Sequence, residues 1–274
     1  MIAPTTSQET VFILGISSDI GMALAERYLK EGYFVVGTYR NKVNFPPTVG
    51  QVHLLPCDIG SPDSINQAVA AYARLGKPWE IFISAVGTEE PIGQFFDCDF
   101  NAWEQSVMVN STAQLRALHA LYSQRRRGRV AQVVFFAGGG TNNAFANYSA
   151  YCVSKIVLIK MCELLADESP DLNVFILGPG FVRTKIHQQT LNNRMAAGSN
   201  YDKTLAFLTA ETPGTSHDDI YRCVNWCVAQ GREIAGGRNF SIVHDPWREP
   251  GERLVDQLRT DVNKFKLRRH RNAD

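Results

Sequence analysis

The chain has 274 residues, with 45% hydrophobic and 20% charged side chains and a formal net charge of +1. These values fit one globular α/β domain, and the balanced charge gives no field that would attract nucleic acid. No run of 18 apolar residues occurs, so we expect no membrane span. The start of the chain lacks a signal-peptide pattern, and the six cysteines include no Cys-x-x-Cys pair. We therefore expect a cytoplasmic protein with free thiols and no bound metal.

The first forty residues predict a strand, a glycine-rich turn, a helix and a second strand. Residues 11–14 and 33–38 are short apolar runs, and 22–29 have apolar residues at helical spacing before a helix stop at Gly32. The turn at 15–21 reads Gly-Ile-Ser-Ser-Asp-Ile-Gly. Its glycines allow backbone amides to approach a pyrophosphate, and the helix N-terminus adds partial positive charge. This order predicts a dinucleotide-binding unit, and a tight turn without a ligand is the alternative.

The end of the second strand bears on which dinucleotide would bind. An acidic residue there would bind the ribose diol, but the chain has Tyr39 and Arg40. A guanidinium can bind a 2′-phosphate, so we expect NADP(H), with NAD(H) still possible. A surface arginine without this role is the alternative.

Alternation of strands and helices continues along the chain. Strands are expected at 11–14, 33–38, 52–55, 79–83, 130–136, 172–177 and 239–243. Helices are expected between them, at 22–29, 61–76, 100–124, 147–165 and 218–230. This pattern predicts a single Rossmann-type domain over 1–274, with a doubly wound, parallel, seven-stranded sheet in a three-layer αβα arrangement. We expect the polar segment 185–210 to be a mobile lid and 248–274 to be a basic tail that is solvated or packs between subunits.

Asn110 lies in the middle of the helix expected at 100–124. An amide is a neutral-to-poor helix former at such a position. It is either a satisfied polar side chain or an active-site amide that anchors a water molecule.

Tyr151 and Lys155 are four residues apart, so on a helix they lie on one face. A free phenol has a pKa of about 10 and is a poor acid-base catalyst near pH 7, but a nearby ammonium favours the phenolate. Such a pair can pass a proton to or from an alcohol or carbonyl. The same spacing also occurs by chance in solvated helices.

Together these features resemble the short-chain dehydrogenase/reductase family over about residues 10–245. The match rests on the turn at 15–21, Asp58, the segment 84–87, Asn110, the pair Tyr151 and Lys155, and Pro179-Gly180 with Thr184, all in the family's order.

The resemblance implies roles for these residues. Tyr151 would be the general acid or base, Lys155 would lower its pKa and hold the nicotinamide ribose, and Asn110 would order a water. The resemblance places the cofactor on Gly15, Ser17, Ser18, Ile20, Gly21, Arg40, Asp58, Ile59, Ala85, Gly87, Tyr151, Lys155, Pro179, Gly180, Val182 and Thr184. It also implies a homodimer or homotetramer.

Three departures from the family pattern stand out. Asp19 replaces the middle glycine of the turn and can cap the following helix, and 84–87 alters the Asn-Ala-Gly turn. The family's serine, some thirteen residues before the tyrosine, is absent from 137–140. Losing one polarising donor typically costs roughly 10²–10³ in rate. Thr141 is the nearest hydroxyl, Ser149 is another candidate, and backbone amides of the glycine run are a third.

We expect an NADP(H)-dependent oxidoreductase that transfers hydride between the nicotinamide and a carbonyl or secondary alcohol. The alternatives are a cofactor-binding protein with a scaffolding or regulatory role, and a sugar-nucleotide epimerase or dehydratase. Basic residues in 185–210 suggest a small substrate that carries an anionic or sugar-linked group.

Overall fold

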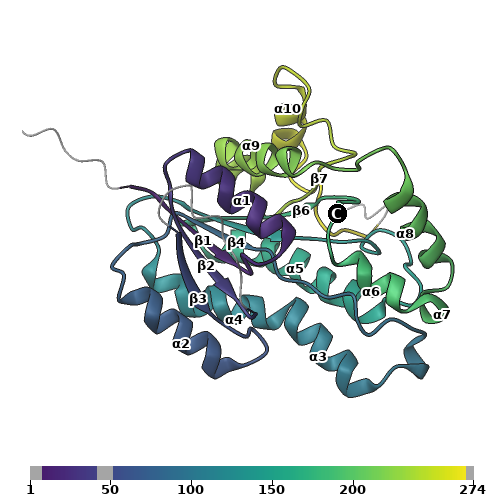
Figure 1. The fold of residues 1–274 in the computed structure, drawn as a ribbon. Coiled ribbons are helices and arrows are strands. Elements are labelled where there is room, and N and C mark those ends of the chain that lie inside the picture. Colours follow the sequence, from purple (N-terminus) through teal and green to yellow (C-terminus); the bar gives the residue numbers. More distant parts are fainter. Residues whose placement is uncertain (1–7, 42–51, 270–274) are drawn as a thin grey trace, which may run out of the picture.

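Seven short apolar strands form one parallel sheet in the computed structural model, which describes residues 8–41 and 52–269 (Figure 1). The strands are β1 (Thr10–Leu14), β2 (Phe34–Tyr39), β3 (Val52–Pro56), β4 (Ile81–Ser84), β5 (Ala131–Phe136), β6 (Leu172–Gly178) and β7 (Asn239–Ser241). Their order in the sheet is β3-β2-β1-β4-β5-β6-β7, and every pairing is parallel. The predicted doubly wound sheet is confirmed.

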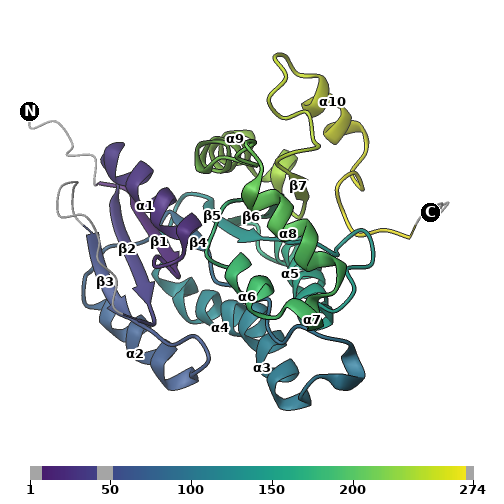
Figure 2. The same cartoon turned by 45° about the vertical axis from the view of Figure 1, so that its right-hand side comes forward.

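Helices cover both faces of this sheet (Figure 2). They are α1 (Asp19–Lys30), α2 (Pro62–Ala73), α3 (Phe100–Asn110), α4 (Thr112–Leu121), α5 (Ser149–Glu168), α6 (His187–Asn192), α7 (Arg194–Ala197), α8 (Ser199–Thr209), α9 (His217–Ala235) and α10 (Arg253–Thr260). Alternate residues of a strand point to opposite faces. In β1, Val11 and Ile13 join the core under α1 and α9, whereas Phe12 and Leu14 join the core over α2, α4 and α5. The three-layer prediction is therefore confirmed.

The sheet order places a topological switch at β1. The chain runs outward from β1 to β2 and β3, then returns to pair β4 with the other side of β1. The loops after β1 and β4 therefore diverge and leave a crevice at the carboxyl edge of the sheet, where ligands of this architecture bind.

One predicted helix is two helices. The backbone of Ser111 (φ −138°, ψ −83°) leaves the helical region, so α3 ends at Asn110 and α4 begins at Thr112. The Ser111 hydroxyl donates to the Val107 carbonyl at 2.6 Å, which satisfies one group freed at this end. The expectation that Asn110 lies in the middle of a helix was wrong.

The segment 185–210 is mostly helical, because α6, α7 and α8 occupy it. The mobility expected for it stays a prediction. Gln189 accepts a hydrogen bond from the Glu89 amide at 2.7 Å, and Asn193 donates to the Glu90 side chain at 3.3 Å. These bonds attach α6 and the start of α7 to the loop that follows β4.

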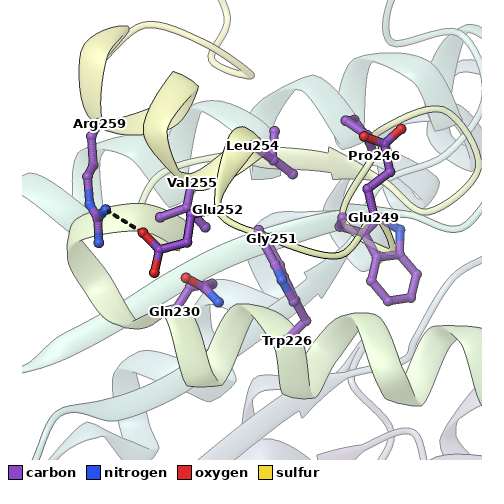
Figure 3. A pocket seen from close by; sticks show the side chains of 10 residues that line it. Trp226, Gln230, Pro246, Glu249, Gly251, Glu252, Leu254, Val255 and Arg259 are labelled. Carbon is purple, nitrogen blue, oxygen red and sulfur yellow. Dashed lines mark ion pairs between the residues drawn. The ribbon is translucent and has the colours of Figure 1, made fainter.

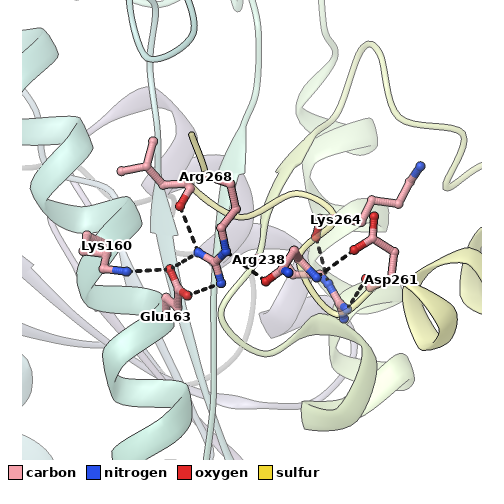
Figure 4. A network of polar contacts seen from close by, with 8 residues as sticks. Lys160, Glu163, Arg238, Asp261, Lys264 and Arg268 are labelled. Atoms are coloured by element: carbon pink, nitrogen blue, oxygen red, sulfur yellow. Dashed lines mark hydrogen bonds and ion pairs between the residues drawn. The ribbon is translucent and has the colours of Figure 1, made fainter. Parts of the chain in front are cut away.

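The described part of the C-terminal tail, to residue 269, is folded against the domain (Figure 4). Leu254 and Leu258 of α10 are buried. The Phe265 carbonyl accepts a hydrogen bond from the Asn239 amide at 2.8 Å, and the Arg268 guanidinium donates one to the Glu163 carboxylate of α5 at 3.0 Å. These residues pack on their own domain, so the solvated alternative does not hold for them; packing between subunits stays a prediction, and 270–274 lie outside the described part. No helix within the described ranges is long and apolar enough to cross a bilayer.

Candidate active site

A cavity of about 900 Å³ opens at the carboxyl edge of the sheet. Many of the predicted site residues line it, namely Ser18, Ile20, Arg40, Ala85, Gly87, Thr141, Tyr151, Lys155, Pro179, Gly180, Val182 and Thr184. Others lie outside its lining, namely Gly15, Ser17, Gly21, Asp58, Ile59 and Asn110. Residues far apart in the sequence therefore share one concave site, and their roles in it stay predictions.

A second cavity lies between α9 and the segment that carries α10 (Figure 3). It has about 120 Å³ and is lined by Trp226, Leu254 and Val255 among others. Ligand pockets usually have about 300–1,000 Å³, so this one is too small for a dinucleotide. A third cavity, of about 660 Å³, lies on α10 and contains none of the predicted site residues, so the cavity of about 900 Å³ is the candidate active site.

The glycine-rich turn between β1 and α1 is tight enough to require glycine. Gly15 has φ +82°, and a Cβ there would lie 2.7 Å from the Val86 side chain. A Cβ on Gly21 would lie 2.5 Å from the Gly15 carbonyl oxygen. Ser18 caps α1, because its hydroxyl accepts a hydrogen bond from the Gly21 amide at 3.0 Å. Such a turn at a helix N-terminus suits a pyrophosphate.

Asp19 was expected to cap α1, but Ser18 holds that position. The Asp19 carboxylate instead accepts a hydrogen bond from the Lys185 amide at 2.7 Å. The Lys185 ammonium in turn donates to the Ser17 carbonyl. These contacts join the turn after β1 to the segment after β6.

Arg40 and Asp58 follow β2 and β3, and only Arg40 lines the cavity. The Arg40 side chain is exposed. Asp58 accepts a hydrogen bond from the Gly60 amide at 3.0 Å, and this contact shapes the turn before α2. Its expected adenine contact stays a prediction.

Tyr151 and Lys155 lie on α5, and both side chains are buried. The Lys155 ammonium donates to the Phe136 carbonyl at 2.9 Å and lies 5.4 Å from the centre of the Tyr151 ring. Burial lowers the pKa of Lys155 to about 8. Burial also raises the pKa of Tyr151, with smaller contributions from the charges of Glu89 and Cys152. This direction is opposite to the one that Lys155 alone would give.

The position of the family's serine, thirteen residues before Tyr151, is Gly138. A Cβ on Gly138 would collide with the Tyr151 hydroxyl oxygen. The tyrosine hydroxyl therefore lies directly over this glycine, in the space that a side chain would need. Thr141 lines the same cavity and donates to the Gly138 carbonyl at 3.4 Å. Ser149 is turned away, because its hydroxyl accepts from Trp103 at 2.9 Å.

Asn110 is fully buried and binds the backbone of the loop after β4. Its carbonyl oxygen accepts from the Thr88 amide at 2.9 Å, and its amide nitrogen donates to the Thr88 carbonyl at 2.8 Å. These contacts match the alternative of a satisfied polar side chain that positions a loop. Water anchoring by Asn110 stays a prediction.

Several residues in the cavity wall were not predicted as site residues. Glu89 follows the 84–87 segment by two residues, and its distance from that turn was the only sequence signal for it. Gln189 and His187 come from α6, and residues 265–267 come from the tail. The tail residues carry no motif, so only the tertiary structure reveals them.

The parallel sheet, the switch point and the glycine-rich turn define a Rossmann-type protein. The sequence profile described as short chain dehydrogenase matches residues 9–195, and the chain belongs to that family. Members of the family bind NAD(P)(H), act on small molecules and typically form oligomers.

Relatives agree with this placement. The pig protein named dehydrogenase/reductase SDR family member 4 is 25% identical over 191 residues, which are 66% of this chain and 68% of that protein. A short chain dehydrogenase/reductase structure from Saccharomyces cerevisiae has a TM-score of 0.76 at 17% identity, covering 90% of this chain and 98% of that one. A Burkholderia cenocepacia short chain dehydrogenase in complex with NADP has a TM-score of 0.70 at 22% identity, covering 85% and 95%.

Proposed function

We propose that the protein is an NADP(H)-dependent oxidoreductase that transfers hydride between the nicotinamide and a carbonyl or secondary alcohol. The observation that carries this proposal is the buried Tyr151–Lys155 pair in a cavity of about 900 Å³ that reaches the glycine-rich turn. Membership of the short chain dehydrogenase family supports the reaction class. The relatives reported above are described as dehydrogenases or reductases, so they lend no support to an epimerase, dehydratase or scaffolding role.

The cavity has the features that a dinucleotide needs. Ser18 and Ile20 at the start of α1 would lie against the pyrophosphate, where backbone amides point outward. Arg40 supports a preference for the 2′-phosphate of NADP, because its exposed guanidinium borders the cavity. When bound, the nicotinamide supplies or accepts the hydride.

In this proposal, Tyr151 exchanges a proton with the substrate oxygen. Lys155 helps to hold the nicotinamide ribose. Its ammonium group, when close to the Tyr151 phenol, favours the ionised form of that phenol. Because position 138 has no side-chain hydroxyl, Thr141 and the backbone amides of 138–140 would donate to the substrate oxygen. For Thr141 this requires its hydroxyl to leave the Gly138 carbonyl. Asn110 holds the loop after β4 in place for this arrangement.

A thermal-shift comparison with NADPH and NADH tests the cofactor proposal. A ligand present at 100 times its Kd stabilises a protein by about 2.7 kcal/mol. We expect the larger rise in melting temperature with NADPH, and we expect Arg40→Ala to reduce that rise while leaving the NADH response unchanged. No shift with either dinucleotide would reject cofactor binding.

The chemistry is tested by NADPH oxidation on a panel of carbonyl compounds. We expect Tyr151→Phe to abolish turnover and to keep the NADPH-dependent thermal shift. Unchanged turnover in this variant would remove Tyr151 from the mechanism. Oligomeric state and cytoplasmic location stay predictions, and sedimentation analysis would decide between monomer, dimer and tetramer.

A further inference from the structure

Glu89 places a carboxyl group in the wall of the catalytic cavity. Its side chain is only 9% exposed, and the proton and hydride steps proposed above do not use it. Burying a carboxylate costs several kcal/mol unless partners compensate for the lost water. The contacts of Glu89 therefore indicate what kind of partner it needs.

Within the described ranges, side chains bond only one of the two carboxylate oxygens. Thr190 of α6 donates its hydroxyl to Glu89 Oε2 at 2.9 Å. Because this uses the threonine proton, the Tyr148 hydroxyl must donate to Thr190 Oγ1, 2.8 Å away. Gln189 fixes the backbone, because it accepts the Glu89 amide at 2.7 Å. The side chain is thus oriented from α6 and from the start of α5.

The second oxygen, Oε1, has no donor among residues 8–41 and 52–269, and no cation in those ranges pairs with Glu89. Glu89 borders the cavity together with Tyr151, and its charge is one of those acting on the phenol. A carboxylate accepts hydrogen bonds at both oxygens. Glu89 therefore offers a free acceptor oxygen in the wall of the cavity that also holds Tyr151.

The charge of the cavity limits what this donor can be. The cavity lining holds four basic side chains (Arg40, Lys155, Lys185 and Lys266) against three acidic ones (Asp19, Glu89 and Asp245), so its balance of charge does not favour a positively charged ligand. A neutral hydroxyl does not depend on this balance and can still donate to the carboxylate.

We propose that Glu89 determines specificity by accepting, at Oε1, a hydrogen bond from a hydroxyl that the substrate carries in addition to its reacting oxygen. The substrate class is therefore hydroxy-carbonyl compounds and the corresponding diols. This inference rests on the proposed function, because that function places the reacting oxygen beside Tyr151.

Calorimetric binding of matched alcohols to the NADP⁺-loaded protein at pH 8, where the Glu89 carboxyl group is mostly ionised, tests the inference. The probes are trans-cyclohexane-1,2-diol, cyclohexanol and trans-2-aminocyclohexanol, which share one ring. A hydrogen bond to a charged group contributes about 1.5–3 kcal/mol, so wild type should bind the diol at least roughly tenfold more tightly than cyclohexanol. We expect Glu89→Leu to abolish this preference and Glu89→Gln to reduce it.

Glu90→Gln is the matched control, because Glu90 is adjacent and exposed, lies outside the cavity lining and would lose the same charge. It should keep the diol preference. If Glu89→Leu does not fold, the isosteric Glu89→Gln, which can still accept from Thr190, decides the matter.

Equal binding of diol and cyclohexanol by wild type, or an unchanged preference in Glu89→Gln, would overturn the proposal. Tighter binding of the amino alcohol than of the diol would also overturn it in favour of a cation site. Turnover of 2-hydroxycyclohexanone with NADPH is measured in the same samples. Absent turnover with an intact diol preference would reject the proposed function and leave the role of Glu89 standing.

Discussion

Gly138 and Tyr151 constrain each other, because there is no room for a Cβ at position 138. The tyrosine hydroxyl lies where a side chain on Gly138 would be, so the two positions must change together. The absent serine is therefore a matter of space as well as of a lost hydrogen-bond donor. In this chain the phenol packs directly against the glycine-rich segment after β5.

Gly138→Ala tests this packing by adding a single methyl group. We expect the added Cβ to displace the tyrosine, to lower the free energy of unfolding by about 1–3 kcal/mol, and to lower turnover. Urea unfolding and NADPH oxidation measure the two effects. Gly139→Ala is the control, because its Cβ would lie at an ordinary 3.6 Å from Phe145. Equal effects of both substitutions would contradict the assigned position of Tyr151.

The raised pKa of Glu89 predicts that the free energy of unfolding depends on pH. Burial raises its pKa from 4.5 to about 7, so the folded protein binds the proton more tightly than the unfolded chain. The contribution of Glu89 to stability is therefore lost as pH rises from 4.5 to 7. We expect Glu89→Gln to be more stable than wild type at pH 8, by roughly 3 kcal/mol, and to show little difference at pH 4.5. Urea unfolding at both values checks this, and a constant difference would contradict it.

At the scale of elements, the C-terminal tail contributes to the site through its packing. Arg238, which precedes β7, has a buried guanidinium that donates to the carbonyls of Leu258 at 2.6 Å and Lys264 at 3.1 Å. Arg268 holds the end of the tail on Glu163 of α5 (Figure 4). These bonds keep residues 265–267 in the cavity wall.

The two arginines should differ in energetic effect. Arg238→Met leaves buried carbonyls without donors, and we expect it to cost about 2–4 kcal/mol. Arg268→Met removes a partly exposed ion pair, and we expect a cost below about 1 kcal/mol. Urea unfolding measures both, and hydrogen exchange at 261–267 reports whether the tail detaches. A larger cost for Arg268→Met would reverse the proposed order.

At the scale of the whole molecule, the site is assembled across the switch point of the sheet. The loops after β1, β2, β4, β5 and β6 all reach one cavity, since parallel strands end at the same edge. The contact between Asp19 and Lys185 joins the two sides of this cavity. It therefore connects the turn expected to bind the pyrophosphate with the segment that leads into α6.

Asp19→Asn tests what the extra carboxylate does there. The amide oxygen can still accept from the Lys185 amide, but the negative charge beside the pyrophosphate site is removed. We expect NADPH to bind several-fold more tightly, with a smaller gain at high salt. Glu31→Gln, at the other end of α1, is the control for a general change of charge. Unchanged binding would show that the Asp19 charge has no effect on the cofactor. Weaker binding would show that the carboxylate is needed for its contact with the Lys185 amide.

The sequence by itself determined the order of the seven strands and of the helices between them outside 185–210, the glycine-rich turn and the Tyr151–Lys155 spacing. These features depend on local periodicity and on residues that are neighbours in the chain. Helix boundaries were less certain, because the break at Ser111 has no glycine or proline to mark it.

Only the tertiary structure decided the rest of the site. The packing of Tyr151 over Gly138, the hold of Thr190 on Glu89 and the tail in the cavity wall all join residues distant in sequence. Burial also decided that the Tyr151 pKa is raised, because removing water disfavours the charged phenolate. The spacing between Tyr151 and Lys155 on the helix alone had suggested a lowered pKa. A pattern of residues can identify the chemical groups at a site. Their pKa values and contacts depend on solvent exposure and on neighbours that only the folded chain brings together.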